Sequence, residues 1–97
     1  MKVLISRGYG AGFSTWNDLE MAIDQDLIEL FENGCTESEL KEACRRKGYG
    51  DFEDGPYMGG FEGLIVVEVP KGVVFKIDED DGYEYIEIFN PNRWFCA

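Results

Sequence analysis

The sequence predicts a single α+β domain in which three or four mostly antiparallel strands form a sheet with a helical hairpin packed on one face. Two observations favour this class. Helical periodicity is confined to the segment 24–47, and short apolar or alternating runs suited to strands lie on both sides of it. The chain has 97 residues, which suits one domain with one modest core, so residues 1–97 are assigned to a single domain.

A first strand is predicted at residues 2–6, because Val3-Leu4-Ile5 is an apolar run suited to an interior position. It leads into residues 7–17, where glycine and aromatic residues alternate; we call this segment the Gly-aromatic loop. Glycine has no side chain to pack, so glycines at positions 8, 10 and 12 indicate positive φ angles or a close approach of the backbone to another group. This loop is the least generic part of the chain.

Two helices are predicted from periodicity and capping signals. Residues 24–33 place apolar side chains on one side at helical spacing, with an aspartate at the start, and Gly34 provides a left-handed stop. The run Thr36-Glu37-Ser38-Glu39 matches a capping box, so a second helix is expected from there to about Lys47. The very short connection makes the pair a helical hairpin.

The second half predicts a long ordered loop followed by three strands. Residues 49–63 mix aromatic, acidic and glycine residues without a usable period. Strands are expected at 64–69, 73–77 and 83–89, and the acidic turn 78–82 joins the last two as a hairpin. Alternation in the last strand places four residues mainly on one face: Tyr83, Tyr85, Glu87 and Phe89.

The charge balance is strongly acidic. Twenty Asp and Glu residues against nine Lys and Arg residues give a formal net charge of −11, and the excess is larger in the second half. Such a field repels nucleic acid and anionic membranes and attracts basic protein surfaces, so we expect no direct binding to nucleic acid or membrane. Solubility alone would also explain the charge. The sharper interpretation is an acidic face that occupies a nucleic-acid-binding groove on another protein.

The cysteines, Cys35, Cys44 and Cys96, are odd in number and show no C-x-x-C spacing. No signal peptide and no apolar run of transmembrane length is recognised. Free thiols in a reducing cytoplasm are therefore expected. Near the end of the chain, Trp94 and Phe95 are expected to dock on the domain, because they would form an exposed apolar patch if they did not.

Signatures of catalysis and of metal binding are weak. The chain has no histidine, which removes Ser-His and Cys-His nucleophile pairs and an imidazole base. We therefore expect a protein that is not an enzyme and uses no cofactor. The acidic turn departs from the calcium-loop pattern, because its glycine falls at the fifth place and Phe89 stands at the twelfth, so no metal site is expected.

The Gly-aromatic loop suggests one kind of binding site. Its glycines match neither the Walker spacing nor the dinucleotide fingerprint, which would need glycine where Phe13 stands. A nucleotide could still stack on the aromatic rings and place a phosphate on the cation. The candidate residues for such a ligand are Arg7, Tyr9, Phe13 and Trp16. A tight loop whose aromatic rings fill the core is the competing interpretation.

The acidic residues of the second half suggest another kind of site, a face that binds a partner protein. Their carboxylates could resemble the spacing of a phosphate backbone, and nearby aromatic side chains could supply apolar anchors. The candidate residues are Asp51, Glu53, Asp54, Glu62, Asp78, Glu79, Asp80, Asp81, Glu84 and Glu87. Sequence does not decide whether they share one face, or whether the segments 7–17 and 49–63 meet in one pocket.

The run Gly-Tyr-Gly-Ala-Gly-Phe-Ser-Thr-Trp-Asn at residues 8–17 resembles the start of a group of small, mostly uncharacterised bacteriophage and prophage proteins, which begin with a strand and a Y-G-A-G-[FW]-S-T-W-N run. Residues 57–62 and 67–77 also look like theirs. The resemblance implies a phage or prophage origin and action in the cytoplasm of a host cell. Small acidic phage proteins often disarm host enzymes or defence systems, and anti-CRISPR proteins are one such class.

Two functional hypotheses follow. The first is a small non-catalytic inhibitor or modulator that binds a basic, nucleic-acid-handling host protein, such as a CRISPR effector, by nucleic-acid mimicry. The second is a small-ligand binder, such as a nucleotide binder or sponge, that uses the Gly-aromatic loop. An enzyme ranks last.

Overall fold

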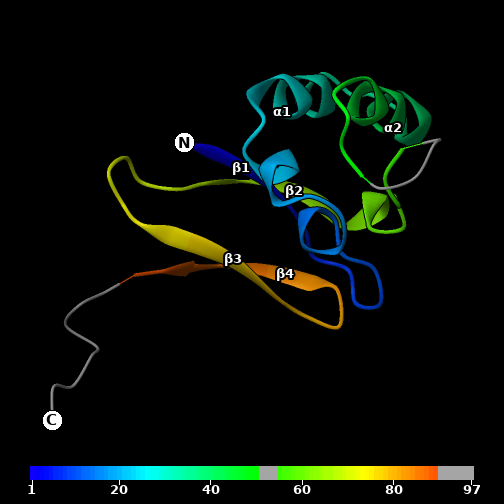
Figure 1. Cartoon of the computed structure of the whole chain (residues 1–97). Coiled ribbons are helices and arrows are strands. Elements are labelled where there is room, and N and C mark those ends of the chain that lie inside the picture. Colours follow the sequence, from blue (N-terminus) through cyan, green and yellow to red (C-terminus); the bar gives the residue numbers. More distant parts are fainter. Residues whose placement is uncertain (51–54, 90–97) are drawn as a thin grey trace, which may run out of the picture.

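A computed structural model describes residues 1–50 and 55–89 of the chain. The elements in chain order are β1 (Lys2–Ser6), α1 (Gln25–Glu32), α2 (Glu37–Arg46), β2 (Leu64–Glu68), β3 (Phe75–Asp80) and β4 (Tyr83–Ile88). The fold is α+β, as predicted, and it has three layers (Figure 1): the two helices, the β1–β2 pair and the β3–β4 hairpin. Within the described residues, neither helix has the length and apolar character needed to cross a membrane.

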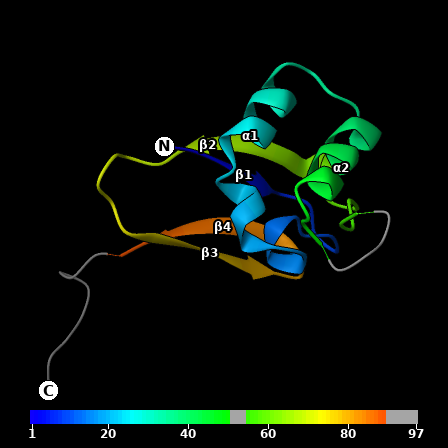
Figure 2. The same cartoon turned by 45° about the horizontal axis from the view of Figure 1, so that its top comes forward.

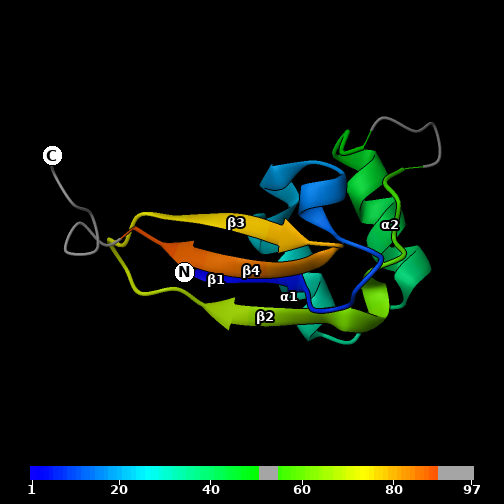
Figure 3. The ribbon, with the colours of Figure 1, turned by 90° about the horizontal axis from the view of Figure 1, so that it is seen from below.

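The strands pair as two antiparallel ribbons, and the predicted single sheet of three or four strands is wrong. In one ribbon Ser6 of β1 lies opposite Leu64 of β2, and in the other Asp80 of β3 lies opposite Tyr83 of β4. β4 runs close to β1 (Figure 3). The backbone amide of Ser6 nevertheless donates to the carboxylate of Glu84 at 2.7 Å. The contact between β1 and β4 is therefore made by a side chain, whereas the strands of a single sheet would be joined by backbone hydrogen bonds.

Both helices begin at the caps that the sequence predicts. Asp24 accepts hydrogen bonds from backbone amides in the first turn of α1, and Thr36 and Glu39 form the capping box of α2. Gly34, with φ of 86°, ends the first helix in the left-handed conformation. The resulting hairpin lies over one side of the β1–β2 ribbon (Figure 2).

Strand β1 is buried on both faces and separates two apolar clusters. Leu4 packs on the side of the helices, and the cluster there comprises Leu4, Phe13, Met21, Leu27, Ile28, Leu40, Cys44, Met58 and Leu64. Val3 and Ile5 face the opposite way and pack with residues of the β3–β4 hairpin, including Phe75 and Ile86. Each fully buried aliphatic side chain contributes about 1.5–3 kcal/mol, so β1 ties the outer layers together.

Strand β3 lies further along the chain than predicted, and the turn of the β3–β4 hairpin is tighter. β3 begins at Phe75 rather than Val73 and includes Asp78, Glu79 and Asp80, which were expected in the turn. The turn consists of Asp81 and Gly82, whose φ angles are 48° and 84°. Positive φ at both central positions is typical of a type I′ turn, which matches the twist of the strands it joins. The acidic residues before the turn therefore alternate between the two faces of a strand.

Candidate functional site

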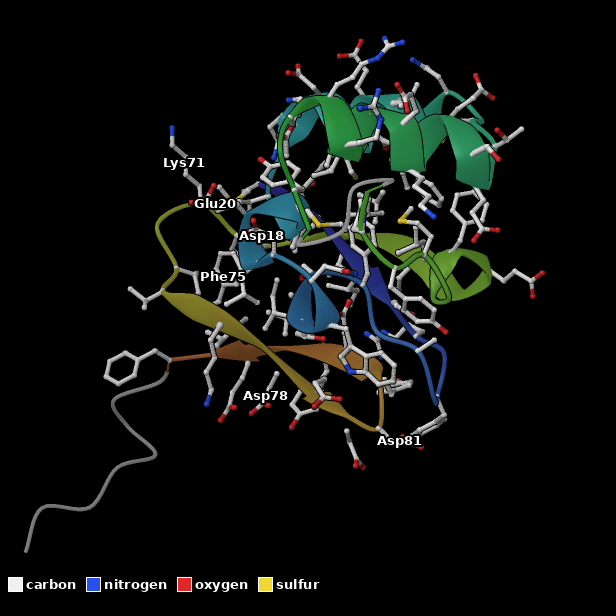
Figure 4. All side chains as sticks on the ribbon, turned by 45° about the vertical axis from the view of Figure 1, so that its right-hand side comes forward. Asp18, Glu20, Lys71, Phe75, Asp78 and Asp81 are labelled. Atoms are coloured by element: carbon white, nitrogen blue, oxygen red, sulfur yellow. The ribbon has the colours of Figure 1, made fainter. Side chains whose placement is uncertain are left out.

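The outer face of the β3–β4 ribbon carries carboxylates and tyrosines. Phe75, Ile77 and Ile86 face inward and pack on the core, so their neighbours along the strands face outward. These outward residues, which we call the tyrosine–carboxylate face, are Lys76, Asp78, Asp80, Tyr83, Tyr85 and Glu87. Figure 4 shows Asp78 and Asp81 on the side of the ribbon away from the helices.

The charges of this face are only partly neutralised. Lys76 Nζ lies 3.6 Å from the Asp78 carboxylate and 3.5 Å from that of Glu87. Asp80 and Asp81 are exposed, and within the described residues neither has an ion-pair partner. The negative charge of Asp78, with burial and Glu87, raises the pKa of Tyr85. The surrounding carboxylates thus favour the protonated phenol of Tyr85, which can donate a hydrogen bond.

The Gly-aromatic loop packs against the same hairpin, so the two predicted sites are neighbours. The ring of Tyr9 stacks on that of Tyr83, with centroids 5.0 Å apart and planes inclined by 21°. The Arg7 guanidinium lies 5.2 Å from the centroid of the Tyr83 ring and donates a hydrogen bond to the Tyr83 hydroxyl. The Gly10 amide donates to the backbone carbonyl of Asp81. Arg7 and Tyr9 thus extend the tyrosine–carboxylate face.

A second aromatic pair joins the loop to the segment 55–63. Trp16 stacks with Tyr57 at 6.2 Å between centroids, and its indole N–H donates to Glu79 at 3.3 Å. The Asn17 side chain donates to the Tyr57 carbonyl and accepts from the Tyr57 amide, both at 2.9 Å. The two segments rich in glycine and aromatic residues therefore meet. Trp16 and Tyr57 remain 42% and 50% exposed, so the meeting point is a surface.

Close backbone packing at this junction is made possible by glycines outside the loop. A Cβ atom on Gly63 would lie 2.7 Å from the nitrogen of Gly8, and one on Gly60 would lie 2.8 Å from the carbonyl oxygen of Ala11. Real Cβ atoms do not approach other atoms so closely. Of the glycines for which the sequence predicts positive φ or close approach, Gly10 has a φ of 82° and a Cβ on Gly12 would lie 2.7 Å from the Trp16 ring, whereas Gly8 shows neither feature. The close backbone approaches at this junction are made by Gly60 and Gly63, outside the loop.

The assignment of Glu84 to a partner-binding acidic surface is wrong, because its side chain is buried with 0% exposure. One carboxylate oxygen accepts the amide of Ser6 at 2.7 Å. The other accepts the amides of Phe13 and Thr15, both at 2.9 Å, and the Thr15 hydroxyl at 2.6 Å. The alternation of β4 indicates that Glu84 faces inward, because Glu84 lies two residues from Ile86, which packs on the core.

The other acidic candidates occupy several places. Asp78, Asp80 and Glu87 lie on the tyrosine–carboxylate face, and Asp81 lies in the adjoining turn. Glu79 lies on the inner side, where its carboxylate accepts the Trp16 indole and the Gly82 amide. Glu62 is exposed on a short 3₁₀ helix, Phe61–Gly63, and not on the ribbon. Asp51, Glu53 and Asp54 lie outside the described residues, as do Trp94, Phe95 and Cys96.

The residues predicted to hold a small ligand lie in different places in the structure. Phe13 is 1% exposed and belongs to the core cluster beneath the helices, so its assignment to a ligand site is wrong. Arg7 and Tyr9 lie against Tyr83, while Trp16 lies against Tyr57. An open depression lies elsewhere, over the helices, and is lined by Leu30, Ser38, Glu39, Glu42, Ala43 and Arg46.

The described part of the chain also contains two cysteine thiols. Cys35 and Cys44 are free thiols, as predicted, and burial raises the pKa of Cys44 to about 12. No group of three or more His, Cys, Asp or Glu side chains in residues 1–50 and 55–89 is placed to hold a metal ion.

Comparisons of the chain with protein-family models, with curated proteins and with solved structures find no match.

Proposed function

We propose that the protein is a small non-catalytic binding protein that covers a basic surface of a nucleic-acid-handling host protein. The binding region comprises the tyrosine–carboxylate face and the adjoining residues Arg7 and Tyr9. One observation carries the proposal: Tyr9 is 70% exposed although its ring is stacked on Tyr83, and the carboxylate of Asp80, which has no ion-pair partner in residues 1–50 and 55–89, lies opposite Tyr83 in the register of the hairpin.

The exposed aromatic rings are suited to act as anchors. Stacking on Tyr83 restrains the ring of Tyr9. Rings that are already restrained lose little conformational entropy on binding, and Tyr and Trp are the residues most enriched at the energetic centres of interfaces. The face thus supplies apolar contact area as well as charge.

The chemistry of the face favours a partner rich in arginine. Arg7 already places a guanidinium beside the Tyr83 ring, and the same arrangement with a partner's arginine would combine ring stacking with hydrogen bonds to nearby carboxylates. Proteins that handle nucleic acid present Arg and Lys to phosphates, so a carboxylate face of this kind would compete with nucleic acid. A CRISPR effector is one such partner, and occupation of its groove in the host cytoplasm would make the protein an inhibitor.

The first test is a titration followed by amide and aromatic NMR shifts. Equal-length peptides rich in arginine, in lysine, or in neutral residues are added at low and at high salt. The arginine peptide should perturb Tyr9, Tyr83 and Tyr85, and its affinity should fall as salt rises. Tyr9→Ala should weaken that affinity about twofold to fivefold. Failure of the arginine and lysine peptides to bind at low salt would refute the proposal.

A matched pair of variants separates the face from net charge. Asp80→Asn with Asp81→Asn removes one charge from the tyrosine–carboxylate face and one from the adjoining turn, and Glu29→Gln with Glu37→Gln removes two from exposed helical positions. The first pair should weaken peptide binding more than the second. Equal effects would mean that net charge alone attracts the peptide.

Competition and ligand screens test the remaining parts of the proposal. The protein should displace a labelled duplex from a purified basic DNA-binding protein in a salt-sensitive manner. A thermal-shift screen with nucleotides should show no stabilisation. A nucleotide shift that Tyr9→Ala abolishes would instead favour the small-ligand alternative, for which Arg7, Tyr9 and Trp16 are the exposed residues.

A further inference from the structure

We infer that Glu84 is the positioning residue of the Gly-aromatic loop, and that its buried carboxylate fixes the loop conformation in which Tyr9 and Trp16 are presented. This inference goes beyond the proposed function, because it concerns the conformation of the free protein and its test needs no partner.

The surroundings of Glu84 are unusual for a buried charge. Within the described residues its hydrogen-bond partners are three backbone amides and one hydroxyl, and no Lys or Arg forms an ion pair with it. Burying a carboxylate is costly unless its lone pairs are satisfied. The loop and β1 must therefore keep their donors aligned for the carboxylate to stay inside. Conversely, the carboxylate holds those donors in place.

The loop has few other means of satisfying the same amides. Residues 14–16 form a short 3₁₀ helix, and the residue before it, Phe13, has no side chain that can accept a hydrogen bond. Glu84 supplies the acceptor from β4 and thus caps this turn from a strand distant in the sequence. Such a cap fixes the position of Thr15, which adjoins Trp16 in the chain.

Loss of the carboxylate should therefore act at both ends of the loop. Trp16 directly follows the residue that makes two of the four hydrogen bonds to Glu84. At the other end, the Gly10 amide is bonded to Asp81 in the turn that leads into β4. The stack of Tyr9 on Tyr83 depends on the same strand that carries Glu84.

Amide hydrogen exchange of the free protein tests the inference. In Glu84→Ala, protection of the Ser6, Phe13 and Thr15 amides should fall by about tenfold to a hundredfold relative to that of Leu40 in α2, because a hydrogen bond to a charged group is lost. Acetate supplies the methylene-sized fragment and the carboxylate that this variant lacks. Millimolar acetate should restore protection at the same amides, and chloride at equal ionic strength should not.

Two milder variants keep the test decisive if Glu84→Ala does not fold. In Glu84→Gln the amide oxygen can replace the carboxylate oxygen that takes three donors, so the amide of Ser6 should lose protection most. Thr15→Val removes the hydroxyl donor and should give a smaller loss confined to Phe13 and Thr15. Loss of protection that is equal at these amides and at Leu40 would overturn the inference, as would no loss at all. If the loop responds as expected but no basic peptide binds, the proposed function fails while the role of Glu84 stands.

Discussion

Gly82 lies directly against the backbone of Ala11. A Cβ atom on Gly82 would lie 2.7 Å from the carbonyl carbon of Ala11 and 2.8 Å from the nitrogen of Gly12. The preceding residue, Asp81, accepts the amide of Gly10. The hairpin turn and the Gly-aromatic loop are therefore packed backbone to backbone, with no room for a side chain between them.

Gly82→Ala should destabilise the protein more than Gly72→Ala. Both glycines have nearly the same positive φ, 84° and 83°, but a Cβ on Gly72 would meet open space. An L-residue in this conformation costs about 1–2 kcal/mol at either site, and overlap with the loop should add about 1–3 kcal/mol at Gly82. Urea denaturation of the two variants measures the difference. Equal losses would show that the loop moves aside at little cost.

Two adjacent hydroxyls should have opposite effects on stability. The Ser14 hydroxyl is buried and, within the described residues, has no hydrogen-bond partner, so Ser14→Ala should raise the free energy of unfolding by about 1 kcal/mol. The Thr15 hydroxyl donates to Glu84, so Thr15→Val should lower it by about 1.5–3 kcal/mol. Chemical denaturation of both variants under one set of conditions checks the signs. A stabilising Thr15→Val would contradict the described geometry.

Asp24 should contribute to acid sensitivity. Burial raises the pKa of Asp24, but hydrogen bonds from Lys47, Tyr49 and the backbone outweigh burial, so the net pKa lies below the usual 3.8. The folded state thus favours the ionised form, and this stabilisation is present above that value and lost as the pH falls below it. Asp24→Asn retains a capping side chain.

The free energy of unfolding should therefore fall less steeply in Asp24→Asn than in the parent protein as the pH drops below about 4. Glu39 and Glu42, whose pKa values are also lowered, are present in both proteins, so the difference isolates Asp24. Denaturant titrations at several pH values provide the curves. Parallel curves would mean that the folded protein does not favour the ionised form of Asp24.

Cys44 should resist thiol reagents. Burial is the main cause that raises the pKa of Cys44 to about 12, and the thiolate is the reactive form. In a Cys35→Ser, Cys96→Ser background, labelling of Cys44 should require unfolding and should accelerate with denaturant. Rapid labelling of the native protein would show that the region beneath α2 opens locally.

The sequence predicted the features that depend on local chemistry. Both helix starts follow from residues within one turn of each other, such as Thr36 and Glu39 in the capping box. The hairpin also follows from nearby residues, although its turn was placed too broadly, because an Asp-Gly pair alone closes it. The predicted single sheet failed for a non-local reason: β1 meets β2 through backbone hydrogen bonds but meets β4 through the Glu84 side chain.

The candidate site was predicted in its parts but not in their arrangement. Arg7, Tyr9 and the acidic residues of the hairpin were named as separate sites, and the structure brings them together through Tyr83. Glu84 was assigned to the surface because it is charged, although strand alternation placed it among inward-facing residues. Its partners, Ser6 and Thr15, are distant in sequence, so nothing local indicated that its charge is satisfied inside.

The pairing of β1 with β2 has a consequence for synthesis on the ribosome. Ser6 lies opposite Leu64, so β1 emerges long before its ladder partner exists. The helical hairpin needs only nearby residues and can form first. The side chains of Val3 and Ile5 are covered later still, because they pack against Phe75 and Ile86 of the β3–β4 hairpin. A nascent chain arrested before the hairpin emerges would leave these two side chains open to aggregation or to chaperones.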